Sequence, residues 1–228
     1  IGRLVALWGF HTSDYPILGP PPYADSIEFL LSQEPSSLDI RIAGNTLSST
    51  NPSVQLDFGG IAKGYAIDIA CDLLRARGIE NAIVNAGGDL RAIGSHGARP
   101  WNIAVRSPGG GVVASIETGH DEAIFTSGNY ERFRQDKKER YPHILDPRTG
   151  WPVTDLSSVT VITDQGILAD AAATAITVAG LADWLDVARK LGTGTVMLID
   201  EHGVVHMTRA MSDRVELLKE SEVRIYDF

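Results

Sequence analysis

Two oxygen-bearing side chains lie four residues apart in segment 169–174, Ala-Asp-Ala-Ala-Ala-Thr. In a helix, positions i and i+4 lie on one face, so the Asp170 carboxylate and the Thr174 hydroxyl would point to the same place. Hard cations such as Mg²⁺ prefer oxygen ligands and keep positions open for water and phosphate. The pair therefore fits a magnesium site. It also fits a capping aspartate followed by a core threonine, which the spacing alone favours.

A glycine pair joins a predicted strand to a predicted helix. Residues 54–58 alternate like a strand, Gly59 and Gly60 supply the turn, and helical periodicity covers 61–77. Glycine lets the backbone approach a ligand closely, and the free N–H groups of a first helical turn attract anions. Lys63 opposes the helix dipole there, which indicates a phosphate contact. A tight connection with a solvated lysine is the alternative.

Two further segments place polar groups at strand ends. Residues 85–89, Asn-Ala-Gly-Gly-Asp, can frame a flat ring or hold a ribose hydroxyl. A hairpin turn in which Asp89 binds local backbone is equally consistent with them. Residues 126–128, Thr-Ser-Gly, can cradle phosphate or ring oxygens, although Ser-Gly is also ordinary turn chemistry.

A histidine stands just before a predicted turn. Residues 146–149, Asp-Pro-Arg-Thr, fit a type I turn with proline in its second position. The turn does not explain His143, whose imidazole, with an ordinary pKa of about 6.5, can act as a general base near neutrality. A histidine bound to turn carbonyls is the alternative, and the residues alone slightly favour it.

Composition narrows the class of protein. The chain has 228 residues, 43% hydrophobic and 21% charged, which is typical of a folded protein and excludes a disordered one. A net charge of −9 argues against a nucleic-acid surface but not against a phosphorylated small ligand. Cys71 is the single cysteine, so neither an intrachain disulfide nor a cysteine metal cluster can form. No apolar run approaches the roughly 20 residues of a membrane helix.

The elements that must position these groups follow from periodicity and turn signals. The first 25 residues, rich in proline, glycine and aromatics, predict an irregular loop that can act as a lid. Predicted helices cover 26–32, 61–77, 169–178 and 181–191, and predicted strands cover 54–58, 82–85, 102–106, 112–117, 123–126, 158–163, 196–199 and 204–207. The strands 102–106, 112–117 and 123–126 are typical of an antiparallel meander. In helix 61–77, a single face carries Ala62, Tyr65, Ile69, Leu73 and Ala76. This mixture without a regular βαβ rhythm predicts an α+β fold.

Five segments, in this order, resemble the ApbE family of FAD:protein FMN transferases: residues 56–65, 85–89, 126–130, 143–150 and 169–174. The similarity runs from about Leu4 to the helix beyond Thr174. It implies an ApbE-like (T-fold-like) α+β architecture of mixed and antiparallel sheets packed with helices. We expect one domain over 1–228 that lacks the N-terminal part of the family domain. The chain begins at Ile1 without methionine, so we expect sequence upstream, where an export signal or lipid anchor would lie.

The resemblance also implies an activity. The enzyme would cleave FAD, attach FMN through a phosphoester bond to a Thr or Ser of an acceptor flavoprotein, and release AMP. Mg²⁺ would bind Asp170, Thr174 and a main-chain carbonyl near Ala62, while His143 and Lys63 would be catalytic. The residues implied to contact FAD are Asp57, Gly59, Gly60, Lys63, Gly87, Gly88, Asp89, Thr126, Ser127, Gly128 and His143.

Two other functions share this set of residues. One is a Mg²⁺-dependent FAD pyrophosphatase, in which water replaces the Thr or Ser nucleophile. The other is a non-catalytic FAD-binding protein, which the combination of Asp170, Thr174 and His143 disfavours. The resemblance places the protein on the outer face of the cytoplasmic membrane or in the periplasm, with the cytoplasm as the alternative.

Overall fold

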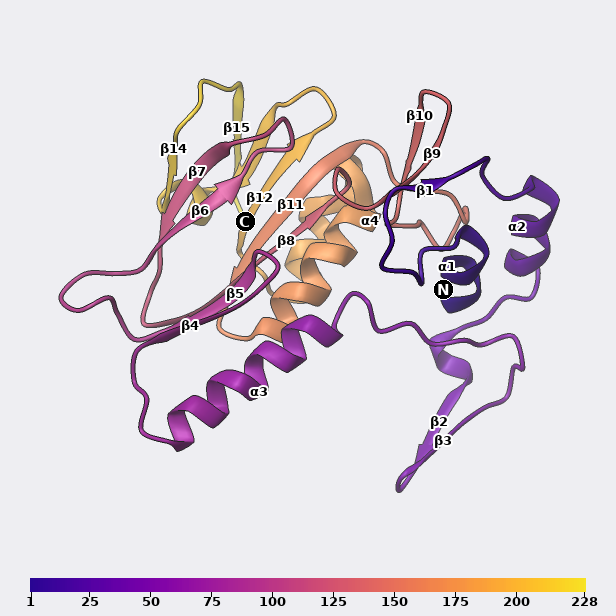
Figure 1. Ribbon diagram of the computed structural model, residues 1–228, viewed down its shortest axis with the longest axis horizontal. Helices are drawn as coiled ribbons and strands as arrows, with labels where there is room; N and C mark the ends of the chain where they lie inside the picture. Colours follow the sequence, from indigo (N-terminus) through magenta and orange to yellow (C-terminus); the bar gives the residue numbers. More distant parts are fainter. The chain divides into compact units, whose positions relative to one another are not determined.

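The chain folds as two units in the computed structural model, which describes residues 1–228. Unit 1 comprises Ile1–Phe58 and Glu131–Thr154, and unit 2 comprises Gly59–Tyr130 and Asp155–Phe228. Figure 1 follows the chain from the indigo N-terminus to the yellow C-terminus. The single domain expected from the sequence stays a prediction.

Unit 1 is built around aromatic side chains. Its elements are α1 (Gly2–Trp8), β1 (Ile17–Leu18), α2 (Ala24–Leu31), the 3₁₀ helix η1 (Ser37–Asp39), β2 (Ile40–Ala43), β3 (Thr46–Ser49), β9 (Phe133–Asp136) and β10 (Glu139–Pro142). β9 pairs with β1 in parallel and with β10 antiparallel, and β2 and β3 form a separate hairpin. Trp8 is fully buried beside Leu4, Phe10 and Ile27, and its indole N–H donates to the Gly150 carbonyl at 2.9 Å.

Two predictions for unit 1 need correction, and one hairpin was missed. Residues 2–8 form helix α1 rather than a loop, because Leu4 and Trp8, four residues apart, bury one face of a helix in the aromatic core. Residues 54–58 alternate like a strand but lie outside every strand, since no neighbouring strand pairs with them. The hairpin of β2 and β3 was not predicted at all. The predicted helix 26–32 is confirmed as α2.

Unit 2 contains the large sheet. Its elements are α3 (Ala62–Ala76), β4 (Ala82–Ala86), β5 (Asp89–Ile93), β6 (Asn102–Arg106), β7 (Val112–Glu117), β8 (Asp121–Gly128), β11 (Leu156–Thr163), α4 (Gly166–Leu191), β12 (Thr195–Asp200), β13 (Val205–Thr208), α5 (Arg209–Ser212), β14 (Val215–Leu217) and β15 (Val223–Tyr226). The seven-stranded sheet has the order β15-β13-β12-β11-β8-β5-β4, and all neighbours are antiparallel except β13 and β15. A second sheet has the order β14-β7-β6.

The two faces of the large sheet are covered differently. Along β11, Val159 and Val161 pack against α4, whereas Ile162 joins a core shared with β6 and β7. The period of two along a strand sends successive side chains to opposite faces, so one strand serves both layers. Helices therefore cover one face of this sheet, as Figure 1 shows for α3 and α4, and the small sheet covers the other.

β8 departs from the predicted meander. β6 and β7 pair as expected, but β8 leaves them and inserts between β5 and β11 in the large sheet. Ala123 and Phe125 of β8 pack towards α3, while Ile124 packs towards the small sheet. A strand with apolar residues on both faces is stable only at the centre of a layered unit, which explains its position.

α4 is the long helix of unit 2, and the helical geometry breaks at Gly180, where φ is 71° and ψ is 178°. This break confirms the two successive helices predicted over 169–178 and 181–191. α4 is long and apolar enough to cross a membrane by length and composition alone. Ala172, Ile176 and Trp184 are nevertheless buried in the core of unit 2. A core helix passes the same test of length and composition.

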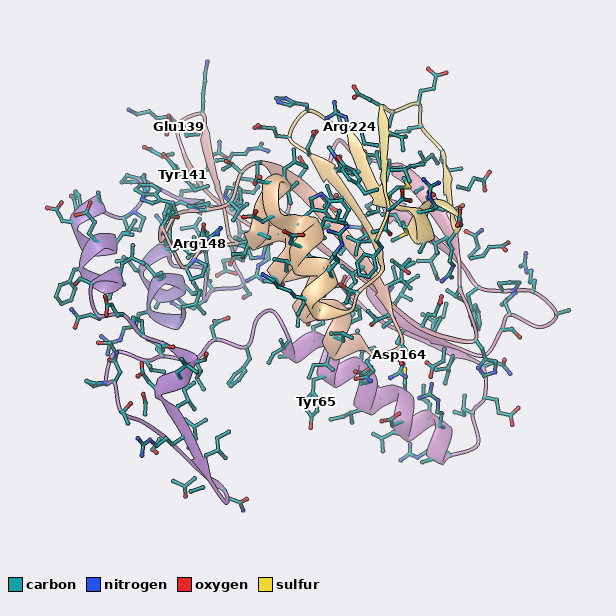
Figure 2. The ribbon with its side chains drawn as sticks, turned by 180° about the vertical axis from the view of Figure 1, so that it is seen from behind. Tyr65, Glu139, Tyr141, Arg148, Asp164 and Arg224 are labelled. Atoms are coloured by element: carbon teal, nitrogen blue, oxygen red, sulfur yellow. The ribbon has the colours of Figure 1, made fainter.

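α3 confirms the predicted helix but turns a different face inwards. Tyr65, Ile69 and Leu73 are 57%, 42% and 55% exposed, and Tyr65 projects from the helix in Figure 2. The buried positions are Gly64, Ile67 and Cys71. A glycine on the buried face lets another backbone come close. The prediction selected the face with the most large apolar side chains, and a buried face that contains glycine is missed in this way.

Candidate functional site

The start of α3 meets the first three turns of α4 through small residues in unit 2. A Cβ atom added at Gly60, just before α3, would lie 3.1 Å from the Thr174 Oγ1 atom of α4. Four residues further along, the Gly64 amide donates to Asp170 Oδ2 at 2.9 Å. We call these pairs, Gly60 with Thr174 and Gly64 with Asp170, the α3–α4 seam. The seam brings the predicted glycine turn to the predicted Asp–Thr pair.

Asp170 lies inside a helix rather than capping one. α4 begins at Gly166, so Asp170 stands one turn into it, and the capping interpretation is wrong. Asp170 is only 5% exposed. Burial raises the pKa of its carboxyl above the usual range, while the Gly64 amide and the Lys63 charge pull that pKa down. A buried carboxylate whose charge is incompletely compensated is suited to binding a cation.

The hydroxyl groups at the end of β8 point to opposite faces of the sheet. Ser127 Oγ lies 3.4 Å from Thr174 Oγ1, on the face covered by α4. Thr126 Oγ1 instead lies 2.9 Å from Thr160 Oγ1 on the other face, as the strand period requires. Thr126 reaches the seam side through its backbone, because its amide donates to Asp89 Oδ1 at 2.7 Å.

Lys63 forms an ion pair with Asp89. The side chain of Asp89 is 6% exposed and that of Lys63 is 41% exposed, so the pair reaches from the interior of the unit to its surface. The hairpin predicted over 85–89 is present, with Gly87 and Gly88 at positive φ. The carboxylate of Asp89, however, binds α3 and β8 rather than its own turn. Its charge is one of the causes that raise the pKa of Asp170.

His143 and Asp57 belong to unit 1. The His143 Nδ1 atom lies 3.2 Å from the Arg132 carbonyl, and the ring meets Phe10 edge-on with 6.5 Å between ring centroids. A carbonyl can only accept, so Nδ1 carries the proton and the lone pair of the neutral ring is on Nε2. The carbonyl that His143 binds lies outside the 146–149 turn, which is present as predicted. The roles of His143 and Asp57 stay predictions.

Oxygen atoms are the donors that unit 2 offers to a metal. No group of three or more His, Cys, Asp or Glu side chains is arranged to hold an ion. The seam instead presents the Asp170 carboxylate with the hydroxyls of Thr174 and Ser127. Mg²⁺ is commonly held by one or two carboxylates together with water and substrate phosphates, so this donor set fits it. The ligand role of Ala62, at the start of α3, stays a prediction.

Sequence reasoning missed the two α3 residues that organise the seam, Gly64 and Asp68. Gly64 brings the two backbones together, and Asp68 accepts hydrogen bonds from the start of α4. The available signal was the spacing of Gly64 and Asp68, which lie four residues apart and so share a face of α3.

The sequence is similar to known proteins along most of its length. Residues 1–199 match the model of the ApbE family. The chain is 42% identical over 223 residues to the FAD:protein FMN transferase of Rhodobacter capsulatus, which covers 96% of this chain and 42% of that protein. It is 37% identical over 186 residues to the FAD:protein FMN transferase of Vibrio cholerae, covering 79% and 54%. The chain spans about half the length of these curated relatives.

Solved structures show the same architecture. The ApbE protein of Thermotoga maritima matches with a TM-score of 0.84 at 35% identity, covering 93% of this chain and 70% of that one. The flavin transferase ApbE from Vibrio cholerae matches with a TM-score of 0.78 at 34% identity, covering 93% and 69%. The predicted α+β class with mixed and antiparallel sheets is confirmed.

Proposed function

Because the chain belongs to the ApbE family, we propose that it transfers the FMN part of FAD to a Thr or Ser hydroxyl of an acceptor flavoprotein, with Mg²⁺, and releases AMP. The observation that carries this proposal is the α3–α4 seam. It places a buried carboxylate and two hydroxyls beside the first turn of α3, the end of the helix at which the helix dipole favours phosphate.

The seam would hold the pyrophosphate end of FAD. Asp170, Thr174 and Ser127 supply oxygens for the metal, with the backbone near Ala62 as a further ligand. When bound, Mg²⁺ neutralises pyrophosphate charge and stabilises the leaving AMP. Most of the catalysis of phosphoryl transfer comes from positioning and charge neutralisation, which rigid helices provide well.

Lys63 and Asp89 would fix a positive charge at the phosphate. The ion pair holds the ammonium group at the first turn of α3, and Asp89 is itself anchored by the Thr126 amide. A lysine held in this way loses little freedom when the anion arrives. This lowers the entropic cost of phosphate binding.

His143 would act as the general base. The acceptor hydroxyl oxygen forms a bond to the FMN phosphorus, the bond from that phosphorus to the AMP phosphate oxygen breaks, and the hydroxyl proton moves to Nε2. The Nδ1 hydrogen bond to the Arg132 carbonyl supports this role, because it orients the ring and leaves Nε2 as the acceptor.

Mass spectrometry of an acceptor flavoprotein incubated with this protein, FAD and Mg²⁺ tests the proposal. We expect the acceptor to gain the mass of an esterified FMN while AMP appears in equal amount. An acceptor whose target Thr is replaced by Val serves as the control. Free FMN with AMP and an unmodified acceptor would indicate a pyrophosphatase instead. FAD binding without AMP release would indicate a non-catalytic protein.

A further inference from the structure

We propose that Asp68 is a positioning residue for the metal site, which it controls through the N-terminus of α4 and not by touching the ligand. This inference rests on the proposed function, because it concerns the site formed by Asp170 and Thr174. It identifies what keeps α4 in register with α3.

α4 has no cap of its own. Its N-cap residue, Gln165, makes no side-chain capping hydrogen bond. Instead Asp68, from α3, accepts hydrogen bonds from the Gly166 amide at 2.7 Å and from the Ile167 amide at 2.9 Å. The first amides of a helix have no partner within the helix, so a cap from a neighbouring helix both satisfies them and fixes where the helix begins.

Asp68 is itself held by an arginine that has little freedom. Arg91 Nη1 donates to Asp68 Oδ1 at 2.7 Å, while its Nε and Nη2 atoms donate to the two oxygens of Asp121 at 2.9 and 3.0 Å. The side chains of Arg91 and Asp68 are only 9% and 15% exposed. A bidentate arginine is geometrically specific, so the cap is anchored to the sheet.

The cap continues the seam with the same spacing. Gly60, just before α3, faces Thr174, and within α3 Gly64 binds Asp170 and Asp68 binds Gly166. Each step of four residues from Gly60 to Asp68 is therefore a step of four back along α4. The two helices thus run antiparallel here, and the cap lies at one end of the seam while the metal oxygens lie at the other.

A shift of α4 would disperse those oxygens. Sliding α4 by one residue moves it about 1.5 Å and turns it about 100°. Mg²⁺ requires near-ideal geometry at about 2.0–2.1 Å, so a much smaller displacement already weakens binding. Both Asp68 oxygens are occupied by α4 amides and Arg91, which is consistent with an indirect role.

The variant Asp68→Asn tests this inference. The asparagine Nδ2 group is a donor, so it cannot accept the hydrogen bond that one of the two α4 amides, of Gly166 or Ile167, makes to Asp68. That N–H group would instead face another N–H group. Metal affinity is measured without turnover, from the rise in unfolding temperature as Mg²⁺ is added in the presence of FAD but without acceptor. We expect affinity for Mg²⁺ to fall about 10–100-fold, as is typical when residues behind a metal ligand are changed. In transfer assays, saturating Mg²⁺ should restore most of kcat.

Asp72→Asn is the matched control. Asp72 lies on the same helix, its side chain is 70% exposed, and its ion pair is with Arg75. It should leave Mg²⁺ affinity unchanged. If Asp68→Asn unfolds, Arg91→Lys is used instead. This variant keeps the positive charge but loses the guanidinium group that binds Asp68 and Asp121 together, and it should show a smaller loss of Mg²⁺ affinity than the one expected for Asp68→Asn.

Two outcomes would overturn the inference. One is a lower unfolding temperature of Asp68→Asn with Mg²⁺ affinity unchanged, which would mean that Asp68 only stabilises the fold. The other is a wild-type protein that Mg²⁺ does not stabilise. Failure of the proposed function is seen separately, as Mg²⁺ stabilisation of the wild type without flavin transfer to the acceptor.

Discussion

Adding a single methyl group at Gly64 should separate the two helices that form the proposed metal site. A Cβ atom at this position would lie 2.7 Å from the Ile167 amide nitrogen and closer still to the Gly166 carbonyl oxygen. Ordinary van der Waals contact begins at 3.4 Å, so the helices must part by about 0.7 Å to relieve even the looser of these contacts. Both obstacles are backbone atoms, so no side chain can rotate out of the way.

The energies can be estimated from opposing effects. Overpacking of this kind costs about 1–3 kcal/mol, whereas alanine is more favourable than glycine in a helix by about 1 kcal/mol. The Gly64→Ala variant should therefore lose up to about 2 kcal/mol of unfolding free energy. For a chain of this size, that corresponds to a fall of about 4–8 °C in Tm. A separation of about 0.7 Å also exceeds the roughly 0.2 Å tolerance of metal–ligand distances.

The assay is thermal unfolding with FAD, with and without Mg²⁺. At 100 times its dissociation constant, Mg²⁺ should stabilise the wild type by about 2.7 kcal/mol, and Gly64→Ala should lose most of that increment. Gly109→Ala is the control, because Gly109 has no positive φ and the nearest atom to its added Cβ is 4.0 Å away. A Gly64→Ala protein with wild-type stability and a full Mg²⁺ increment would refute the close approach of α3 and α4.

Three further variants test charges and the base. Burial raises the pKa of Asp170, so its ionised form lowers the stability of the fold at neutral pH. Asp170→Asn should therefore raise the Tm of the EDTA-treated protein and abolish stabilisation by Mg²⁺. A lower Tm of the variant would contradict this. His143→Ala should keep FAD binding and lose about 10²–10⁴-fold in transfer rate, and a wild-type rate would remove His143 as the base. Asp200 is buried, which alone would raise its pKa, but the Val204 amide and His206 lower it overall. Asp200 therefore stabilises the fold above a pH of about 4 and stops doing so as pH falls through its lowered pKa. Asp200→Asn should cost about 1–3 kcal/mol at pH 7, and urea unfolding should show this difference shrinking in acid.

Local signals predicted the parts of unit 2 that depend on neighbours in sequence. The spacing of Asp170 and Thr174 placed both on one face of a helix, and both lie on α4. The break between two helical patterns falls at Gly180, whose φ of 71° suits glycine. These features could be recognised because the chemistry of each is decided within a few residues.

Features decided by distant partners could not be predicted in this way. The ion pair of Lys63 with Asp89 joins α3 to β5, and nothing near Lys63 in the sequence indicates it. The alternation of 54–58 is typical of a strand, yet a strand needs a neighbour to pair with, and none is present. The inward face of α3 depends on the backbone of α4 at Gly166, which excludes large side chains from position 64.

The interruption of unit 2 between β8 and β11 has an evolutionary consequence. These strands are direct neighbours, with Gly128 opposite Ser158, yet residues 131–154 of unit 1 lie between them in the chain. Replacing a tight hairpin loop by so long an excursion costs only about 2 kcal/mol of closure entropy, because each doubling of loop length costs about 0.6 kcal/mol. The excursion carries His143 and can vary in length or sequence without changing the register of the sheet. Selection can thus alter the proposed proton acceptor and its surroundings independently of the seam.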